Sequence, residues 1–150
     1  MYYANLNRNK KGITLNLKAE EGKDIFKKLV KKADVVIENY RPGVMSNLGL
    51  NYETVLKKIN PRLIYGAISG FGSYGPYSQR PGYDIISQGM GGLMSVTGSE
   101  GGEPTRAGNA MGDILGGMNL VIEIMLALQC PNPPESAPPV FLSSAFLAFR

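Results

Sequence analysis

Hydrophobic and polar positions divide the first third of the chain into strand and helix candidates. Residues 12–18, GITLNLK, alternate apolar and polar side chains, which predicts a strand. Residues 19–33 place four apolar side chains, Ile25 and Leu29 among them, on one helical face. Acidic residues come early in this segment and lysines late, as the helix dipole favours. A strand followed by an amphipathic helix is therefore predicted.

The next segments continue this alternation of strands and helices. We predict, in order, a buried strand at 34–40, short helices at 44–50 and 51–59, and a strand at 62–72. Asn51 is the candidate N-cap of the second short helix. Strands that alternate with helices predict an α/β fold, a Rossmann-like parallel sheet with flanking helices.

A glycine-rich segment and a long helix come next. Fifteen of the 19 glycines lie between Gly66 and Gly117. A helix over residues 83–98 is weakened by each internal glycine by about 1 kcal/mol relative to alanine. Residues 109–129 predict a long buried helix. Clustered glycines indicate the close approach of another backbone or of a ligand.

The last 21 residues have a different character. Five of the ten prolines fall between 131 and 139, and the apolar run that follows has no polar face. We therefore divide the chain into residues 1–129, one folding unit, and residues 130–150, an atypical Pro-rich and apolar tail.

Composition limits the chemistry. The chain has 150 residues, no histidine and one cysteine, Cys130. The absence of histidine removes the commonest general base and metal ligand, so no metal site is expected. A single cysteine is compatible with the reducing cytoplasm, where we place the protein. We see no unbroken run of about 18 apolar residues and expect no membrane span.

Charge is distributed unevenly. Residues 1–62 hold 13 Lys and Arg against 6 Asp and Glu, whereas residues 63–150 hold 3 against 6. A solvated basic face, a nucleic-acid site and a site for a phosphorylated small molecule are all compatible with this. No zinc-finger, helix-turn-helix or RNP-like signature accompanies the charge, so nucleic acid is the least favoured partner.

Asp113 is the strongest candidate for catalysis. It is the only charged residue between Arg106 and Glu123, and Gly112, Gly116 and Gly117 leave bare backbone around it. A carboxylate near a helix start is favoured in its ionised form. It can attack an activated acyl group to give a mixed anhydride. The alternative is an N-cap aspartate without chemistry.

Two loops are candidates for ligand binding. The spacing Gly70-x-Gly72-x-x-Gly75 follows a predicted strand and matches a dinucleotide loop, although Pro76 interrupts any helix there. A loop that presents tyrosines to a ligand and a purely structural loop are the alternatives. Residues 38–43, ENYRPG, lie where a strand should end, which favours either nucleotide contacts or a plain turn.

Taken together, these stretches resemble the class III CoA-transferases, of the CaiB/BaiF type, which include formyl-CoA transferase and acetyl-CoA:oxalate CoA-transferase. The resemblance covers roughly residues 2–129. It is carried by residues 5–50, by residues 60–108, which include SGFGSYGPYSQRPGYD, and by residues 110–128 with the pair Gly112-Asp113. Each piece is unspecific, but their order is specific.

The resemblance implies a function and a site. The family's catalytic aspartate corresponds to Asp113, which would form an aspartyl anhydride and then an aspartyl-CoA thioester before CoA passes to an acceptor acid. No permanently bound cofactor is implied; acyl-CoA is a substrate and a small carboxylic acid is the acceptor. The family's CoA contacts correspond to Leu15, Asn16, Leu17, Lys18, Asn39, Tyr40, Arg41, Pro81, Gly82, Tyr83 and Asp84. Racemase members have histidine at the position of Tyr83, so the racemase branch is not expected.

The chain also departs from the family. Members are more than twice as long and form interlocked homodimers, so we expect an N- and C-terminally truncated fragment of a larger fold. The glycine loop that shields the intermediate and the segments that contact the acceptor have no counterpart here. We therefore expect weak or no activity from the 150 residues alone. The alternative is a non-catalytic fragment that binds CoA or associates with another subunit.

Overall fold

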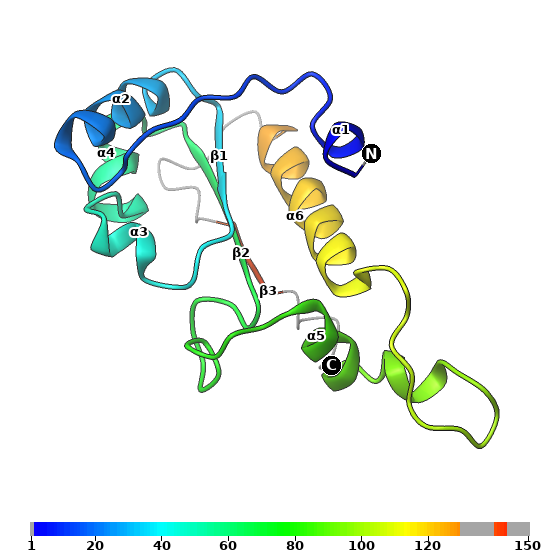
Figure 1. Ribbon diagram of the computed structural model, residues 1–150. Helices are drawn as coiled ribbons and strands as arrows, with labels where there is room; N and C mark the ends of the chain where they lie inside the picture. Colours follow the sequence, from blue (N-terminus) through cyan, green and yellow to red (C-terminus); the bar gives the residue numbers. More distant parts are fainter. Residues whose placement is uncertain (1, 130–139, 144–150) are drawn as a thin grey trace.

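The computed structural model describes residues 2–129 and 140–143 as an α/β fold (Figure 1). Its elements are α1 (Tyr2–Leu6), α2 (Glu20–Val30), β1 (Val35–Glu38), α3 (Val44–Asn47), the π-helical turn η1 (Tyr52–Leu56), α4 (Lys57–Ile59), β2 (Ile64–Ser69), α5 (Asp84–Met90), the 3₁₀ turn η2 (Leu93–Val96), α6 (Met111–Gln129) and β3 (Val140–Ser143).

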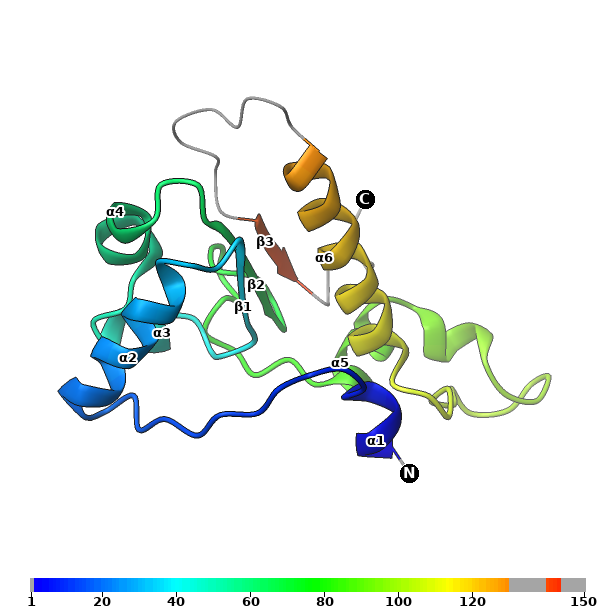
Figure 2. The ribbon, with the colours of Figure 1, turned by 90° about the horizontal axis from the view of Figure 1, so that it is seen from above.

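The sheet is parallel, with the strand order β1-β2-β3. Val35 is in register with Ile64, and Gly66 with Val140. Helices α2, α3 and α4 cover one face of the sheet and α6 covers the other (Figures 1 and 2). The predicted fold class, a parallel sheet with flanking helices, a glycine-rich segment and a long helix, is confirmed. One strand, β3, comes from the segment 130–150 that we had separated as a tail.

Each face of the sheet has its own hydrophobic core. The larger cluster packs between the sheet and the helices α2 to α4, and it contains Val30, Met45, Leu50, Tyr52, Leu56, Leu63, Tyr65 and Ala67. The smaller cluster joins Ile64 of β2 to Leu120 and Ile124 of α6. The sheet is therefore anchored on both sides, which fixes the positions of the loops that follow β1 and β2.

The predicted strand at 12–18 is wrong. This segment contains no strand, and Ile13 is 67% exposed. Alternation alone does not make a strand, because the backbone also needs a partner, and within the described residues β1 pairs only with β2. Leu17 still packs against the larger cluster, so part of the predicted apolar face is used.

The long helix α6 is confirmed, but its burial is not. Gly112, Gly116, Leu120 and Ile124, spaced four apart, are its buried residues. Much of the rest of its apolar surface is exposed: Ile114, Met118, Val121, Ile122, Met125, Leu126 and Leu128. The pattern identified an apolar helix but not how much of it the neighbouring elements cover.

This helix also corrects our reading of hydropathy. Met111–Gln129 reaches a mean hydropathy of 1.6 over 18 residues, which is long and apolar enough to cross a membrane. Our expectation had required an unbroken apolar run, and scattered glycines and polar residues interrupt this one. A single such helix is weak ground for a membrane location, because core helices can have the same composition. The absence of a membrane partner stays a prediction.

The predicted cap, buried strand and glycine-containing helix differ in how well they match the structure. Asn51 caps η1 as predicted, because its Oδ1 accepts the Thr54 amide hydrogen at 3.1 Å. The strand at β1 is confirmed, but Ile37 is 57% exposed, so the strand is not fully buried. The helix predicted at 83–98 breaks into α5 and η2 at Gly92, whose φ is +77°.

Candidate functional site

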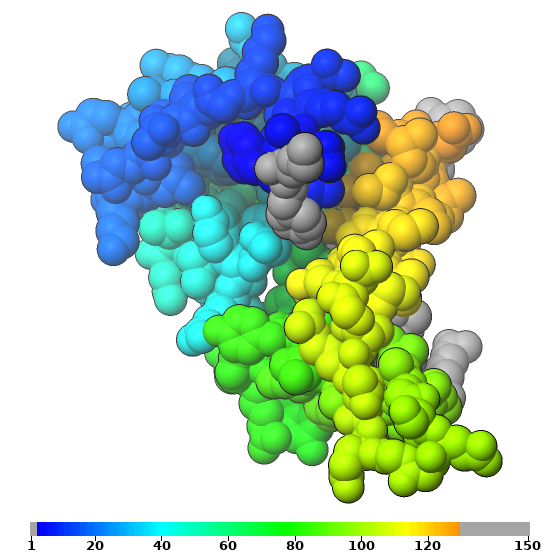
Figure 3. Space-filling view, turned by 45° about the vertical axis from the view of Figure 1, so that its right-hand side comes forward, coloured from blue at the N-terminus to red at the C-terminus, as the bar shows by residue number. Residues whose placement is uncertain are grey.

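A cavity of about 450 Å³ lies beyond the carboxyl ends of β1 and β2. Ligands commonly bind at this edge of open parallel sheets. Eight predicted site residues line it: Asn39, Tyr40, Arg41, Pro81, Gly82, Tyr83, Asp84 and Asp113. The rest of the lining comes from Pro42, Ile68, Ser69, Gly70, Arg80 and Gly117. Figure 3 shows the contributing segments, coloured cyan, green and yellow, around a hollow.

The turn after β1 is held by a carboxylate of the strand itself. Glu38 accepts the backbone N–H of Tyr40 through Oε2 and the Tyr65 hydroxyl through Oε1, the latter at 3.1 Å. Burial, and secondarily the Glu38 charge and hydrogen bond, raise the pKa of Tyr65, so this hydroxyl remains a donor. These two hydrogen bonds hold the turn whose residues Asn39, Tyr40 and Arg41 line the cavity.

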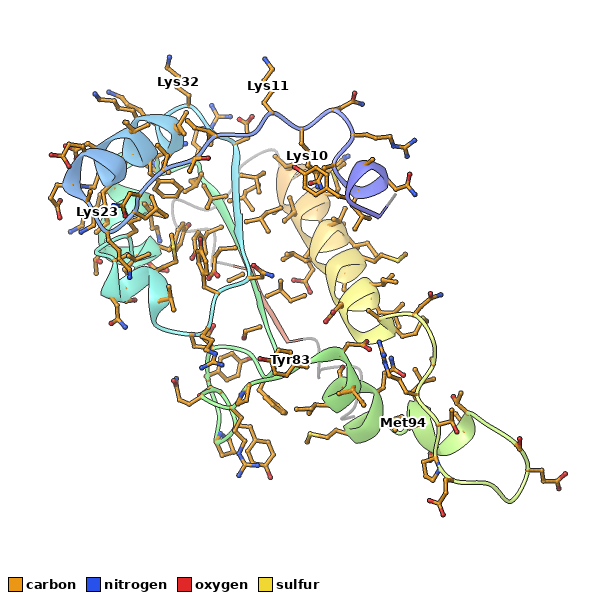
Figure 4. All side chains as sticks on the ribbon, viewed as in Figure 1. Lys10, Lys11, Lys23, Lys32, Tyr83 and Met94 are labelled. Carbon is orange, nitrogen blue, oxygen red and sulfur yellow. The ribbon has the colours of Figure 1, made fainter. Side chains whose placement is uncertain are left out.

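The next wall depends on two glycines that touch. A Cβ built on Gly82 would lie 2.2 Å from Cα of Gly70, and the reverse contact is equally close. No side chain fits at either position, so the segment before α5 lies directly against the end of β2. This crossing places Pro81 and Tyr83 at the cavity, and Figure 4 shows Tyr83 beside α5.

The dinucleotide-loop interpretation of Gly70, Gly72 and Gly75 is wrong. Residues 71–80 form bends and turns, and no helix begins after Gly75, so no helix N-terminus is presented to a phosphate there. The loop is instead organised by Tyr77, whose ring packs edge-on against Phe71 and lies 4.3 Å from the Arg80 guanidinium.

The third wall is the junction between α5 and α6. Asp84 is 8% exposed, and its Oδ1 accepts the backbone N–H of Gly112 at 2.9 Å. Its Oδ2 accepts a hydrogen bond from Nε2 of Gln88 at 2.8 Å and forms an ion pair with the Arg106 guanidinium at 3.2 Å. A Cβ on Gly112 would lie 2.7 Å from Cβ of Ser87, so the Ser87 side chain leaves no room for one.

Asp113 lies on the cavity side of this junction. It is the third residue of α6, it is exposed, and it lines the cavity. Within residues 2–129 and 140–143 its carboxylate has no hydrogen-bond or ion-pair partner. The N-cap alternative is therefore wrong, because α6 begins at Met111 and Asp113 lies inside its first turn rather than before it. The helix start leaves Asp113 available to a ligand.

The electrostatic setting of Asp113 also differs from the expected one. The helix start alone would favour the ionised carboxylate. Instead, partial desolvation, followed by the neighbouring Asp84 charge, raises the pKa of Asp113, while Arg106 opposes the shift. A raised pKa reflects an ionised carboxylate that is less stabilised by its surroundings. Such a carboxylate is more basic and hence more nucleophilic.

The remaining predicted contacts lie elsewhere. None of the described residues that line this cavity comes from Leu15, Asn16, Leu17 or Lys18, so their role stays a prediction. Lys11 and Lys32 lie at the opposite end of the sheet from Tyr83 (Figure 4). Arg41 and Arg80 are the basic residues that line the cavity. The described part of the chain holds no group of three or more His, Cys, Asp or Glu suited to a metal ion.

Sequence reasoning missed the residues that organise the α5–α6 junction. Gln88 is 2% exposed, and its Oε1 accepts the Ala107 amide hydrogen at 2.9 Å. Its Nε2 also donates to the Asn109 carbonyl at 3.1 Å. The available signal was the spacing of Asp84 and Gln88, which places two polar side chains on one face of a short helix.

The chain is similar to known proteins in both sequence and fold. Residues 1–133 match the profile of CoA-transferase family III. The chain is 50% identical over 129 residues to the acetyl-CoA:oxalate CoA-transferase of Acetobacter aceti, covering 85% of this chain and 33% of that protein. It is 46% identical over 127 residues to the human succinyl-CoA:glutarate CoA-transferase, covering 85% of this chain and 29% of that one.

A solved structure agrees. A CAIB/BAIF family protein from Brucella suis superposes with a TM-score of 0.87 at 42% identity, over 95% of this chain and 37% of that one. The chain thus spans about a third of the length of the relatives it matches.

Proposed function

Because this chain belongs to CoA-transferase family III, we propose that it carries the nucleophile and part of the CoA-binding wall of an enzyme that moves CoA from an acyl-CoA to a carboxylic acid. One observation carries the proposal. The Asp113 carboxylate lines a cavity at the carboxyl ends of the strands, while the neighbouring Asp84 satisfies the helix start in its place.

The chemistry proposed for Asp113 needs no histidine. A carboxylate oxygen attacks the carbonyl carbon of the donor thioester, the C–S bond breaks, and CoA leaves as a thiolate. The thiolate then attacks the aspartyl carbonyl of the mixed anhydride, which releases the donor acid and forms an aspartyl-CoA thioester. The acceptor carboxylate then attacks the aspartyl-CoA thioester, which expels the CoA thiolate and forms a second mixed anhydride. The thiolate attacks the acceptor carbonyl of this anhydride, which gives the new acyl-CoA and regenerates the Asp113 carboxylate.

Two walls of the cavity suit CoA. Arg41 and Arg80 supply positive charge for phosphate groups, and Tyr40 supplies an exposed ring on which a base can stack. We propose CoA contacts at Asn39, Tyr40, Arg41, Pro81, Gly82 and Tyr83. Leu15, Asn16, Leu17 and Lys18 would contact CoA only where it extends beyond this cavity.

Substrates are proposed by class only. The acetyl-CoA:oxalate and succinyl-CoA:glutarate enzymes named above bear small dicarboxylic acids in their names, so we propose a small carboxylic acid as the acceptor. Homodimer formation, by similarity to the family, and a cytoplasmic location, from the single cysteine, remain proposals.

We propose that the 150 residues alone transfer CoA slowly. Asp113 is exposed, and an acyl anhydride formed on it would meet water and hydrolyse. A rate comparable to ordinary enzymes, on the order of 1–1000 s⁻¹, would contradict this part of the proposal.

Hydroxylamine trapping tests the nucleophile directly. The purified chain is incubated with acetyl-CoA or succinyl-CoA and then with hydroxylamine, which converts an activated carboxyl group to a hydroxamate detectable by mass spectrometry. We expect the modification at Asp113, its absence in Asp113→Asn, and its retention in the matched control Asp34→Asn. Modification at another acid, or equal modification of Asp113→Asn, would refute the assignment.

Calorimetry with CoA separates the remaining alternatives. Binding that persists in Asp113→Asn but weakens in Arg41→Gln would support the CoA wall. Binding without any trapped intermediate would favour a non-catalytic CoA-binding role. The absence of both, together with salt-sensitive binding to an arbitrary DNA duplex, would favour the nucleic-acid alternative.

A further inference from the structure

A cluster of polar side chains lies at one wall of the cavity, where α5 meets the loop before α6. Asp84, Gln88 and Arg106 form this cluster, which we call the junction cluster. Asp84 and Gln88 are almost fully buried, and Arg106 covers them from the loop side. Buried carboxylates require partners, and here each oxygen of Asp84 has them.

From these contacts we infer that Asp84 is a positioning residue for Asp113 rather than a contact for CoA. Its Oδ1 holds the Gly112 amide, one residue before Asp113, and its Oδ2 holds Gln88 and Arg106. This inference rests on the proposed function of Asp113.

The cluster fixes the helix start from two directions. Gln88 accepts the Ala107 N–H and donates to the Asn109 carbonyl, so the four residues before α6 are tied to α5. Gly112 packs so closely against Ser87 that a Cβ at position 112 would clash with the Ser87 side chain. The backbone that carries Asp113 is thus held by side chains that no substrate needs to touch.

Because Asp84 binds the helix start, the Asp113 carboxylate does not have to cap α6. A helix start has unsatisfied N–H groups, and a nearby aspartate would ordinarily bind one of them. With Gly112 already bound to Asp84, the Asp113 carboxylate is not drawn back to its own helix. The two acids thus have separate roles: Asp84 binds the helix start, and Asp113 faces the cavity.

Asp84 also acts on Asp113 through its charge, in addition to the hydrogen bond with Gly112. The titratable and charged groups around Asp113 are Asp84 from α5, Arg106 from the preceding loop, and Tyr40, Arg41, Arg80 and Tyr83 from the other cavity walls. Asp84 opposes ionisation of Asp113 and Arg106 favours it. Desolvation is the larger cause of the raised pKa of Asp113, and the Asp84 charge adds to it.

Two variants of Asp84 test its contact with Gly112. Asp84→Asn keeps a side-chain oxygen for the Gly112 amide but removes the charge and turns an NH₂ group toward the donors of Gln88 and Arg106, whereas Asp84→Ala removes all of these contacts. The readouts are the titration of the Asp113 carboxyl carbon and the hydrogen exchange of the Gly112 amide, both followed by NMR on the full chain. Glu103→Gln, which removes an exposed acid from the same loop, is the matched control.

We expect the Asp113 pKa to fall in both Asp84 variants and to stay unchanged in Glu103→Gln. Exchange at Gly112 should be about tenfold or more faster in Asp84→Ala but close to wild type in Asp84→Asn. Exchange at Gly112 that is unchanged in Asp84→Ala, or an Asp113 titration that is the same in Asp84→Asn as in wild type, would overturn the inference.

The Asn variant decides the matter even if Asp84→Ala does not fold. Neither readout involves a substrate, so a failure of the proposed transferase chemistry would leave these results intact. Conversely, hydroxylamine trapping at Asp113 with unchanged NMR titration would support the function and reject the positioning role.

Discussion

Oδ1 of Asp84 accepts the amide hydrogen of Gly112 at 2.9 Å across 28 residues of sequence. This hydrogen bond joins α5 to the first turn of α6 and lies directly beside Asp113. The proposed nucleophile is consequently positioned through its neighbour's backbone and not through its own carboxylate.

Gly112→Ala should destabilise the fold by about 1–3 kcal/mol, because the added Cβ would lie 2.7 Å from Cβ and Oγ of Ser87. Gly117→Ala is the matched control on the same helix, since nothing lies within 4 Å of its Cβ position. This control should be neutral or stabilising by up to about 1 kcal/mol. Urea denaturation measures both. Ser87→Gly should restore part of the loss, and no rescue would mean that the contact is not the cause.

Gln88→Met should cost about 1–3 kcal/mol, because the Ala107 amide and one oxygen of Asp84 lose their buried partner while the side-chain volume is nearly kept. Gln79→Met, in an exposed loop, is the control and should change the free energy of unfolding by less than about 0.5 kcal/mol. Equal effects of the two substitutions would show that the Gln88 hydrogen bonds add little.

Asp113→Asn should make stability less dependent on pH. Burial and Asp84 raise the Asp113 pKa above 3.8 in the folded chain, so the native state binds more protons than the unfolded state within that window. The free energy of unfolding of the wild type therefore falls as pH rises through the window. The variant should equal the wild type in acid and exceed it in stability near neutral pH.

Denaturant titrations at a series of pH values check this, with Asp34→Asn as the control for the loss of an exposed acid. A variant that is less stable than wild type at neutral pH would contradict the sign of the shift. Asp113 is exposed, so solvent screens the effect and only its direction is predicted.

Leu120→Ala should cost about 2–5 kcal/mol, whereas Leu126→Ala on the same helix should change stability by less than about 1 kcal/mol. The side chains are identical, but Leu120 is 3% exposed against the sheet and Leu126 is 67% exposed. Thermal or chemical unfolding of the two variants compares them directly. Similar losses would mean that a further layer covers α6 in solution.

The sequence predicted those parts of the fold that short-range patterns determine. The helix α2, the strands β1 and β2 and the Asn51 cap all follow from side chains within a few residues of one another. The failures came where a distant partner decides. Residues 12–18 alternate correctly but pair with none of the strands in residues 2–129 and 140–143, and the exposed face of α6 depends on what packs beside it.

The candidate site divides in the same way. The position of Asp113 among glycines and the turn at Asn39 were visible from the sequence, and the structure brings them to one cavity. The role of Asp84 was not visible, because its partner Gly112 is 28 residues away and glycine gives no sign of which side chain binds its amide. Gly70 was noticed for its spacing, yet it is the contact with Gly82 that requires a glycine there.

The crossing of Gly70 and Gly82 has no rotatable side chain on either side of the contact, so neither residue can relieve it by a change of rotamer. Residue 83 therefore projects from an anchor that cannot adapt to the side chain it bears. A change of chemistry at Tyr83, to an imidazole for example, would exchange the functional group at the cavity while leaving the rim where it stands.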